Sequence, residues 1–289
     1  MELKRKITNE LRKTMKLSAA LKYLNLSKSS YSYTSCNADK PKRVYVLDSE
    51  LSDALRGLTG YELTIGCKKT TTYVRQKHKC VWNHKKVYRH MESLKLLQPK
   101  RIKRRWIKNK RLSFSCPIAS NVRWEADMTF VPTGIGSTYL FIVEDVYDRE
   151  VIGGQMSLQA GAREAVKSLE EAVDKRFGVG NRAEGLHLTV RVDRGCQYTA
   201  EAFETFALSR GINLEFCGVQ TPNDKPYIES FIGCYKSEEV YRNDYTSFFE
   251  AYEGWKNYLE WYNYHRPHGS LGNVSPVSFK ESKLSTIKA

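Results

Sequence analysis

The sequence lacks the features that mark secreted and membrane proteins. Its seven cysteines, at positions 36, 67, 80, 116, 196, 217 and 234, form no Cys-x-x-Cys pair and are odd in number, so a disulfide framework is not expected. No apolar run approaches the ~20 residues of a membrane span. The N-terminus also lacks the apolar core of a signal peptide. These absences predict a cytoplasmic protein that folds in a reducing environment.

Acidic residues are scarce in the first part of the chain. Residues 1–120 contain 29 Lys and Arg but 8 Asp and Glu, whereas residues 121–289 contain 18 and 24. A basic part joined to an acidic part suits a protein that grips a polyanion by counterion release and acts on it at a carboxylate site. The alternative is a generally adhesive basic surface of the kind found on ribosomal proteins.

Three of the 32 acidic residues stand out by their local settings. Asp127 lies in residues 121–131, a run rich in β-branched and aromatic residues that predicts a strand. Asp193 follows a second predicted strand at 186–192 and precedes an Arg-Gly pair where the chain can turn. Between Asp193 and Glu229 there are 35 residues. A single Asp after a strand is usually a turn residue, so the combination carries the argument.

Glu229 is expected on a helix. Asn223 or Asp224 can cap this helix, whose first turn tolerates the proline at position 226. Glu229 and Lys236 are seven residues apart on one face, with their backbones about 10 Å apart along the axis. A carboxylate there can hold a metal while Lys236 meets a nearby phosphate of DNA. The residues expected to face the core are Ile228, Phe231, Ile232 and Tyr235.

Three carboxylates suit a hard divalent cation. Mg²⁺ and Mn²⁺ prefer carboxylate, phosphate and water oxygens to sulfur or imidazole. Two such ions, roughly 3.5 to 4 Å apart, can activate a water or a 3′-hydroxyl and stabilise the leaving oxygen of an in-line displacement. We expect Asp127 to bridge the ions, with Asp193 and Glu229 each completing one shell. Without metal the three acids should repel one another. The pattern predicts a polynucleotidyl transferase.

Two helix pairs are predicted in the basic part. Residues 16–31 give a weak helix-turn-helix signal, with a turn at 25–26 and Ser27 as a helix cap. The second pair joins a helix at 67–77 to another that follows Asn83. In that last helix Val87, Met91 and Leu94 form a buried stripe, which leaves three basic residues to contact DNA: Lys85, Lys86 and Arg89. A basic but merely solvated helix is the alternative.

Residues 98–111 form a basic stretch with little that could build a core. We interpret it as a linker that tracks phosphate and includes Arg104 and Arg105 as DNA contacts. Its Trp106 either packs on the following domain or stacks on a base, and core packing is the favoured outcome.

Several ordered motifs resemble one family, the OrfB-type DDE transposases of the third insertion-sequence family, which are related in fold to retroviral integrases. The resemblance spans nearly the whole chain. One departure lies beside the site, where Arg191 and Val192 stand in place of the family's usual His-Ser pair. The motifs are Trp124-Glu-Ala-Asp-Met-Thr129, Tyr139-Leu-Phe-Ile-Val-Glu-Asp-Val-Tyr-Asp-Arg149, Asp193-Arg-Gly-Cys-Gln-Tyr198, Glu229-Ser-Phe231 with Lys236, and Tyr262-Asn-Tyr-His-Arg-Pro-His-Gly-Ser-Leu271.

The resemblance implies an α/β fold: a ribonuclease-H-like mixed five-stranded sheet flanked by helices, preceded by a small all-α helix-turn-helix region. Its catalytic core would occupy residues 119–282, after a basic helical region at 1–97 and a linker at 98–118. The sequence pattern agrees with this order. It predicts strands near 122–131, 138–146, 150–157, 186–192 and 212–217, and helices at 163–177, 200–209, 227–240 and 245–264.

The resemblance also implies function and partners. It indicates an insertion-sequence transposase that performs metal-dependent DNA cleavage and strand transfer, on the nucleoid of a bacterial cell. Such proteins act on element ends and target DNA as a synaptic homo-multimer, often with an upstream-frame OrfA-type partner. The family tail suggests that Arg266 or His268 contacts DNA or the rim of the site. Two alternatives stay open: a nuclease of the same fold that only hydrolyses, and a DNA-binding regulator that is inactive without its upstream partner.

Overall fold

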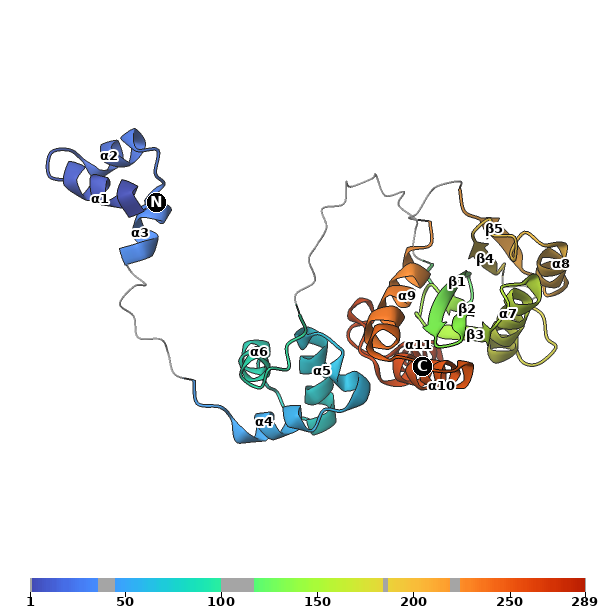
Figure 1. The fold of residues 1–289 in the computed structure, drawn as a ribbon. Helices are drawn as coiled ribbons and strands as arrows, with labels where there is room; N and C mark the ends of the chain where they lie inside the picture. The colour runs from blue at the N-terminus through green and yellow to red at the C-terminus, as the bar shows by residue number, and fades with distance from the viewer. Residues whose placement is uncertain (1, 36–44, 100–116, 184–186, 219–223, 289) are drawn as a thin grey trace. The chain divides into compact units, whose positions relative to one another are not determined.

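The computed structural model describes residues 2–35, 45–99, 117–183, 187–218 and 224–288. The chain divides into two compact units, Met1–Asp48 and Ser49–Ala289 (Figure 1). The predicted contacts Arg104 and Arg105 and the predicted cap Asn223 lie outside the described residues. None of the described helices combines the length and apolar character needed to cross a membrane.

The first unit is a small helical array of α1 (Glu2–Leu11), α2 (Leu17–Tyr23) and α3 (Lys28–Ser35). Asn25 adopts a left-handed backbone with φ 46° in the turn after α2, which a short polar side chain tolerates. The Ser27 hydroxyl then accepts a hydrogen bond from the Ser30 amide at 3.0 Å. The turn and the cap expected from the sequence are both present.

A second helical segment opens the larger unit. It comprises α4 (Ser49–Arg56), the 3₁₀ turn η1 (Gly60–Leu63), α5 (Cys67–His78) and α6 (His84–Ser93). The Asn83 side chain caps α6 by accepting from the Lys85 amide at 2.8 Å. Val87 and Met91 are buried in the small core of this segment and Leu94 packs against it. The buried stripe predicted for α6 is therefore confirmed.

The rest of the larger unit is built on one mixed sheet. Its strand order is β3-β2-β1-β4-β5, with β1, β2 and β3 antiparallel neighbours and β4 and β5 parallel to β1. The expected α/β fold of the ribonuclease-H-like type is confirmed. The strands are β1 (Arg123–Thr133), β2 (Gly136–Asp145), β3 (Val151–Ser157), β4 (Thr189–Val192) and β5 (Asn213–Phe216). The helices are α7 (Ala162–Phe177), α8 (Glu201–Ser209), α9 (Pro226–Glu238), α10 (Phe248–Glu260), the π-helical turn η3 (Trp261–His265) and α11 (Pro276–Lys288), with short 3₁₀ turns η2 (Val240–Arg242) and η4 (Gly269–Leu271).

Each face of the sheet has its own core, because side chains alternate along a strand. On one face Trp124 and Phe141 pack with α7 and α8, and on the other Ile142 packs with α9 and α10 (Figure 1). Two adjacent glycines of β3 let a helix on each face, α7 on one and α10 on the other, lie close to the strand. A Cβ at Gly153 would overlap a carbonyl oxygen of α7, and one at Gly154 would overlap the Trp255 ring of α10.

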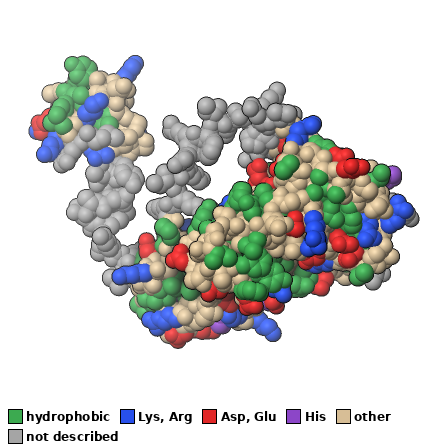
Figure 2. Space-filling view, turned by 45° about the vertical axis from the view of Figure 1, so that its right-hand side comes forward, with side chains coloured by type: hydrophobic (Ala, Val, Ile, Leu, Met, Phe, Trp, Pro, Cys, Tyr) green, Lys and Arg blue, Asp and Glu red, His purple; other side chains and the backbone are tan. Residues whose placement is uncertain are grey.

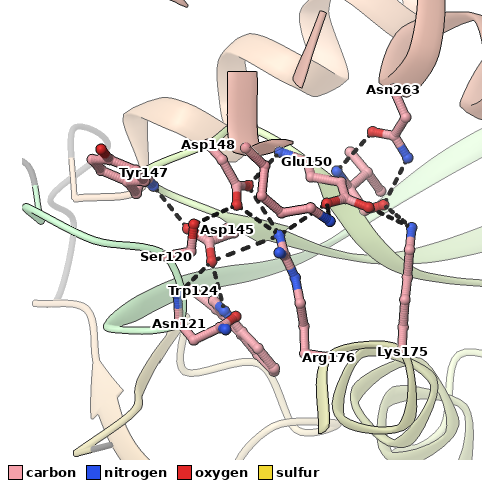
Figure 3. A network of polar contacts seen from close by, with 12 residues as sticks. Ser120, Asn121, Trp124, Asp145, Tyr147, Asp148, Glu150, Lys175, Arg176 and Asn263 are labelled. Carbon is pink, nitrogen blue, oxygen red and sulfur yellow. Dashed lines mark hydrogen bonds and ion pairs between the residues drawn. The ribbon is translucent and has the colours of Figure 1, made fainter. Parts of the chain in front are cut away.

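A buried ionic network fastens the end of β2 to α7 (Figure 3). The Arg176 guanidinium of α7 donates to both Asp148 oxygens at 2.9 and 3.0 Å and lies 3.1 Å from Glu150. Asp145 accepts from the Trp124 indole at 3.2 Å and from the Asn121 amide at 2.7 Å. Burial and the charge on Asp148 raise the pKa of Asp145 to about 6. These contacts tie the end of β2 to α7 and to the segment that precedes β1.

Helix α10 buries Trp255 and Tyr258 in the core, and two residues of the segment that follows it, Arg266 and His268, are buried as well. The Arg266 guanidinium is buried and paired with Glu238 at 2.6 Å. His268 is also buried, with its ring edge-on to Tyr262 at 4.6 Å between centroids. The expectation that one of these two residues contacts DNA or the site rim is wrong, because both side chains are used inside the fold.

Candidate active site

Two of the three predicted acids meet at one edge of the central strands. Glu125 of β1 lies opposite Arg191 of β4 in a parallel register, and continuing that register by two residues sets Asp127 beside Asp193. Both strands run the same way, and β4 ends at Val192 beside the middle of β1, so Asp193 leaves the sheet next to Asp127. Asp127 is largely buried, with 18% of its side chain exposed, whereas 43% of the Asp193 side chain is exposed.

A lysine ammonium lies between these carboxylates. Lys225 Nζ is 3.0 Å from Asp127 Oδ1 and 3.5 Å from Asp193 Oδ2. It also donates to the Ala126 carbonyl oxygen at 3.1 Å. Burial raises the pKa of Asp127, an effect that the Lys225 charge opposes and the neighbouring Asp193 charge reinforces. The pair of aspartates therefore already holds a cation in this structure.

Glu229, the third predicted acid, approaches from α9. Its side chain is exposed, yet partial desolvation and the charge on Asp127 raise its pKa. The residues predicted to anchor this helix do so, because Ile228, Phe231 and Tyr235 are buried and Ile232 packs against the same core. Glu229 is thus carried by a helix whose opposite face is fixed to the sheet.

The start of α9 differs from the expected cap. Lys225, and not Asp224, occupies the N-cap position, and its side chain caps nothing. The helix amides of Tyr227 and Ile228 instead donate to Glu125 Oε2 at 3.1 and 2.9 Å. A carboxylate at a helix N-terminus satisfies unpaired amides and suits the helix dipole. Glu125 therefore ties the helix that carries Glu229 to the strand that carries Asp127.

Arg191 fastens the segment just before α9. Its Nη1 donates to the Asp224 carbonyl oxygen at 2.7 Å, and its other nitrogens pair with Glu215 of β5 at 2.8 and 3.1 Å. The Asp224 carboxylate accepts from the Gly218 amide at 3.0 Å. Arg191, one of the two residues that depart from the pattern of the resembled family, thus has a defined role, because it holds the chain in place as it enters α9.

The donor chemistry of this edge fits a divalent metal. Asp127 and Asp193 are hard oxygen ligands already gathered around a positive charge, and Glu229 is electrostatically coupled to Asp127. Within the described part of the chain, no three or more Asp, Glu, His or Cys side chains are drawn together tightly enough to hold a metal ion. The group that lies between Asp127 and Asp193 in this structure is the Lys225 ammonium.

Models of the integrase core domain match two overlapping parts of the chain, residues 118–222 and 210–276. Together they span more than half of its length and contain all three acids. A protein named as transposase InsK of the insertion sequence element IS150 from Escherichia coli K12 is 24% identical over 287 residues, covering 95% of this chain and 97% of that one. The chain belongs to the insertion-sequence transposases with an integrase core.

Other similar proteins match a smaller share of the transposase. The transposase for insertion sequence element IS904 of Lactococcus lactis is 29% identical over 164 residues, which cover 56% of this chain and 62% of that protein. Among solved structures, the simian T-cell lymphotropic virus intasome in complex with PP2A regulatory subunit B56 gamma aligns with a TM-score of 0.46 and 16% identity. That alignment covers 68% of this chain and 69% of the other.

Three residues that position the site of the transposase were not predicted as part of it: Glu125, Arg191 and Lys225. The available signal for Glu125 was its place on the same side of the predicted strand as Asp127. For Lys225 it was the position four residues before Glu229. Neither signal is specific, because charged residues at such positions usually face solvent.

We expect Glu125→Ala to destabilise the transposase by about 2 kcal/mol, because two buried helix amides lose their acceptor. Cleavage should also fall roughly tenfold, as for other supporting groups of a metal site, since Glu229 loses its anchor. Glu125→Gln keeps an acceptor oxygen and should retain most of both properties. Urea denaturation and a nicking assay on the same preparations measure this. Equal losses in the two variants would show that the hydrogen bonds are not the reason.

The predicted DNA contacts of the transposase are found on two helices. Lys85 is exposed at the start of α6, and Lys86 and Arg89 are partly exposed, with Arg89 Nε donating to the Lys85 carbonyl oxygen at 2.9 Å. Lys236 lies two turns after Glu229 on α9 and is partly exposed. All four side chains thus reach the surface, and their contacts with DNA stay a prediction.

Proposed function

We propose that this transposase cleaves and joins DNA strands with Asp127, Asp193 and Glu229 as ligands of Mg²⁺ or Mn²⁺. The observation that carries the proposal is that Asp127, in the middle of β1, and Asp193, just after β4, hold the Lys225 ammonium between them. Two bound ions would supply a polarised water or 3′-hydroxyl and would stabilise the leaving oxygen. The protein's own contribution is to hold the three carboxylates rigidly.

The three carboxylates are held by different elements: β1, the turn after β4, and α9. Asp127 is fixed by the centre of β1 and is the proposed bridging ligand. The Asp193 carboxylate is oriented by the Gly195 amide, which donates to it at 2.8 Å. Glu229 is exposed on α9, where it can complete a metal shell when the DNA phosphate arrives. Preorganised ligands of this kind lower the cost of reaching the in-line geometry.

We propose that the basic part of the chain delivers DNA to this site. In this proposal the chain has three regions. Residues 1–97 bind DNA, and residues 98–118 form a linker that contacts phosphates through Arg104 and Arg105. Residues 119–282 form the catalytic core. The excess of 29 basic over 8 acidic residues before position 121 supports it. Lys236 would contact a phosphate near Glu229. The DNA substrates are the element ends and the target.

We propose a homo-multimer, with an OrfA-type upstream partner as a further subunit. Apolar side chains reach the surface between charged ones (Figure 2). Three large apolar side chains, Phe130, Ile135 and Phe249, are 51%, 69% and 76% exposed. Gly134, at the tip of the β1–β2 hairpin, donates to the Tyr245 carbonyl oxygen at 2.8 Å. The hairpin tip and the start of α10 therefore lie together, which supports a contact surface there.

The test uses labelled DNA that carries the flanking ends of the element, with the purified chain and either Mg²⁺, Mn²⁺ or EDTA. Joined products in the presence of metal support strand transfer. Nicked products without joining indicate a nuclease that only hydrolyses. Binding without cleavage indicates a regulator, or a need for the OrfA-type partner, and adding that partner separates the two.

We expect the double change Lys85→Gln and Arg89→Gln to weaken binding to any DNA sequence by roughly tenfold at moderate salt. It should also reduce the slope of log K against log salt concentration by about 2, one for each phosphate that no longer has a cationic partner on the protein. Lys167→Gln, an exposed lysine of α7, is the control. Fluorescence anisotropy over a salt series measures both quantities. An unchanged slope would mean that α6 is only a solvated helix.

A further inference from the structure

Lys225 is placed unusually for a lysine. It is 6% exposed, whereas lysines are almost never this buried unless they are paired. Its ammonium has three donors, and three acceptors surround it: Asp127 Oδ1, Asp193 Oδ2 and the Ala126 carbonyl oxygen. The nitrogen also lies 6.0 Å from the centre of the Tyr198 ring. The Lys225 ammonium is therefore surrounded by these three oxygens and the Tyr198 ring.

That position is the one that a metal bound by the two aspartates would take. Mg²⁺ needs oxygen ligands at about 2.0 to 2.1 Å in near-octahedral geometry. An ammonium within 3.0 Å of one carboxylate and 3.5 Å of the other leaves no room for it. The two cations also repel each other strongly in a partly buried site. Lysine and metal therefore compete for the same pair of carboxylates.

We infer that Lys225 is an internal counter-ion that occupies the metal position in the metal-free protein and leaves it when the metal binds. This rests on the proposed function, since it takes Asp127 and Asp193 as metal ligands. The lysine keeps the two aspartates together against their mutual repulsion. Because it is the N-cap residue of α9, its flexible four-carbon stem can turn away while the helix stays fixed through Glu125.

Two consequences follow for the site. The metal-free protein should be more stable with the lysine than without it, because an unpaired carboxylate pair is costly. Metal should bind more weakly with the lysine than without it, because the ammonium must be displaced. Once displaced, the ammonium is available to a DNA phosphate at the same edge.

The first test measures the reactivity of the Lys225 amine in the full chain, by acetylation with an N-hydroxysuccinimide ester and mass spectrometry. In EDTA the buried amine should be protected. In millimolar Mg²⁺ it should react several-fold faster, while Lys167 on α7 reacts equally in both. Melting temperatures of wild type and Asp127→Asn, with and without Mg²⁺, report metal binding independently. Protection that persists while Mg²⁺ raises the wild-type melting temperature would overturn the inference and leave the metal site standing.

The second test uses Lys225→Met, which keeps the apolar stem and removes the charge. Mn²⁺ binding, measured by isothermal titration calorimetry, should be several-fold tighter than in wild type, and the melting temperature in EDTA should be lower. Equal or weaker Mn²⁺ binding would overturn the inference. Failure of both wild type and Lys225→Met to bind any divalent ion would overturn the proposed metal site as well. If the variant does not fold, the amine reactivity of wild type still decides.

Discussion

Glu229→Gln should reduce metal-dependent cleavage of element-end DNA by ~100-fold or more, the scale seen when one preorganised group that stabilises the transition state is removed. Glutamine has the same shape but is a weak ligand for a hard cation. The side chain is exposed on a helix held by the opposite face, so folding should be unaffected. Activity and stability are therefore expected to separate, and a gel-based cleavage assay with a thermal melt measures both.

The matched control for this loss is Glu204→Gln, an exposed glutamate on α8, which should cleave like wild type. Asp193→Asn should show the same loss of cleavage as Glu229→Gln, because both are proposed ligands. Retention of more than a third of wild-type cleavage by Glu229→Gln would exclude this residue from the site. A parallel fall in melting temperature would mean that its role is structural.

Arg176→Met should destabilise the protein by about 3 to 5 kcal/mol, the cost of removing one partner from a buried charge pair. Its guanidinium contacts Asp148 and Glu150 in the interior, and the three acidic residues of the network are at most 1% exposed. Methionine fills a similar volume but leaves negative charges uncompensated. Denaturation in urea measures the loss. Arg163→Met, an exposed residue at the start of the same helix α7, should change stability little.

The loss of stability in Arg176→Met should increase as the pH rises. In wild type the pKa of Asp145 is already raised to about 6, mainly by burial and by Asp148, and the Arg176 charge holds the pKa of Glu150 low. Without Arg176 the folded-state pKa of Asp145 should rise further, and that of Glu150 should rise from its lowered value while Lys175 and Lys280 still pair with it. The folded variant then binds more protons, so its stability falls as the pH rises. The destabilisation should be larger at pH 8 than at pH 5.5, and the opposite trend would contradict the network.

The regular elements were predictable because their residues alternate or repeat with clear periods. All five strands appear close to the expected ranges, and the helix of Glu229 buries the expected side chains. The meeting of Asp127 and Asp193 was also predictable in outline, since the sequence predicts the two strands that carry them, β1 and β4, which are neighbours in the sheet. The alternation of a strand and the three-to-four-residue repeat of a helix involve only neighbouring residues, so they can be recognised in the sequence alone.

The contacts that tie distant segments together were not predictable. Glu125 is 102 residues from Tyr227, and Lys225 is 99 residues from Ala126. No local pattern distinguishes a buried charge that meets a partner at that distance from one in solvent. The tail residues Arg266 and His268 were placed at the surface for the same reason, although Glu238 and Tyr262 hold them inside.

The glycine pair of β3 has a consequence for how this protein tolerates sequence change. At Gly153 and Gly154 the helices α7 and α10 contact the backbone of β3 directly, with no side chain between. The distance between these two helices is therefore set by the thickness of one strand. Trp255 of α10 in turn contacts Phe231 and Tyr235 of α9 edge-on. Substitutions elsewhere in the two cores can therefore accumulate while the distance from the sheet to the Glu229 helix stays the same.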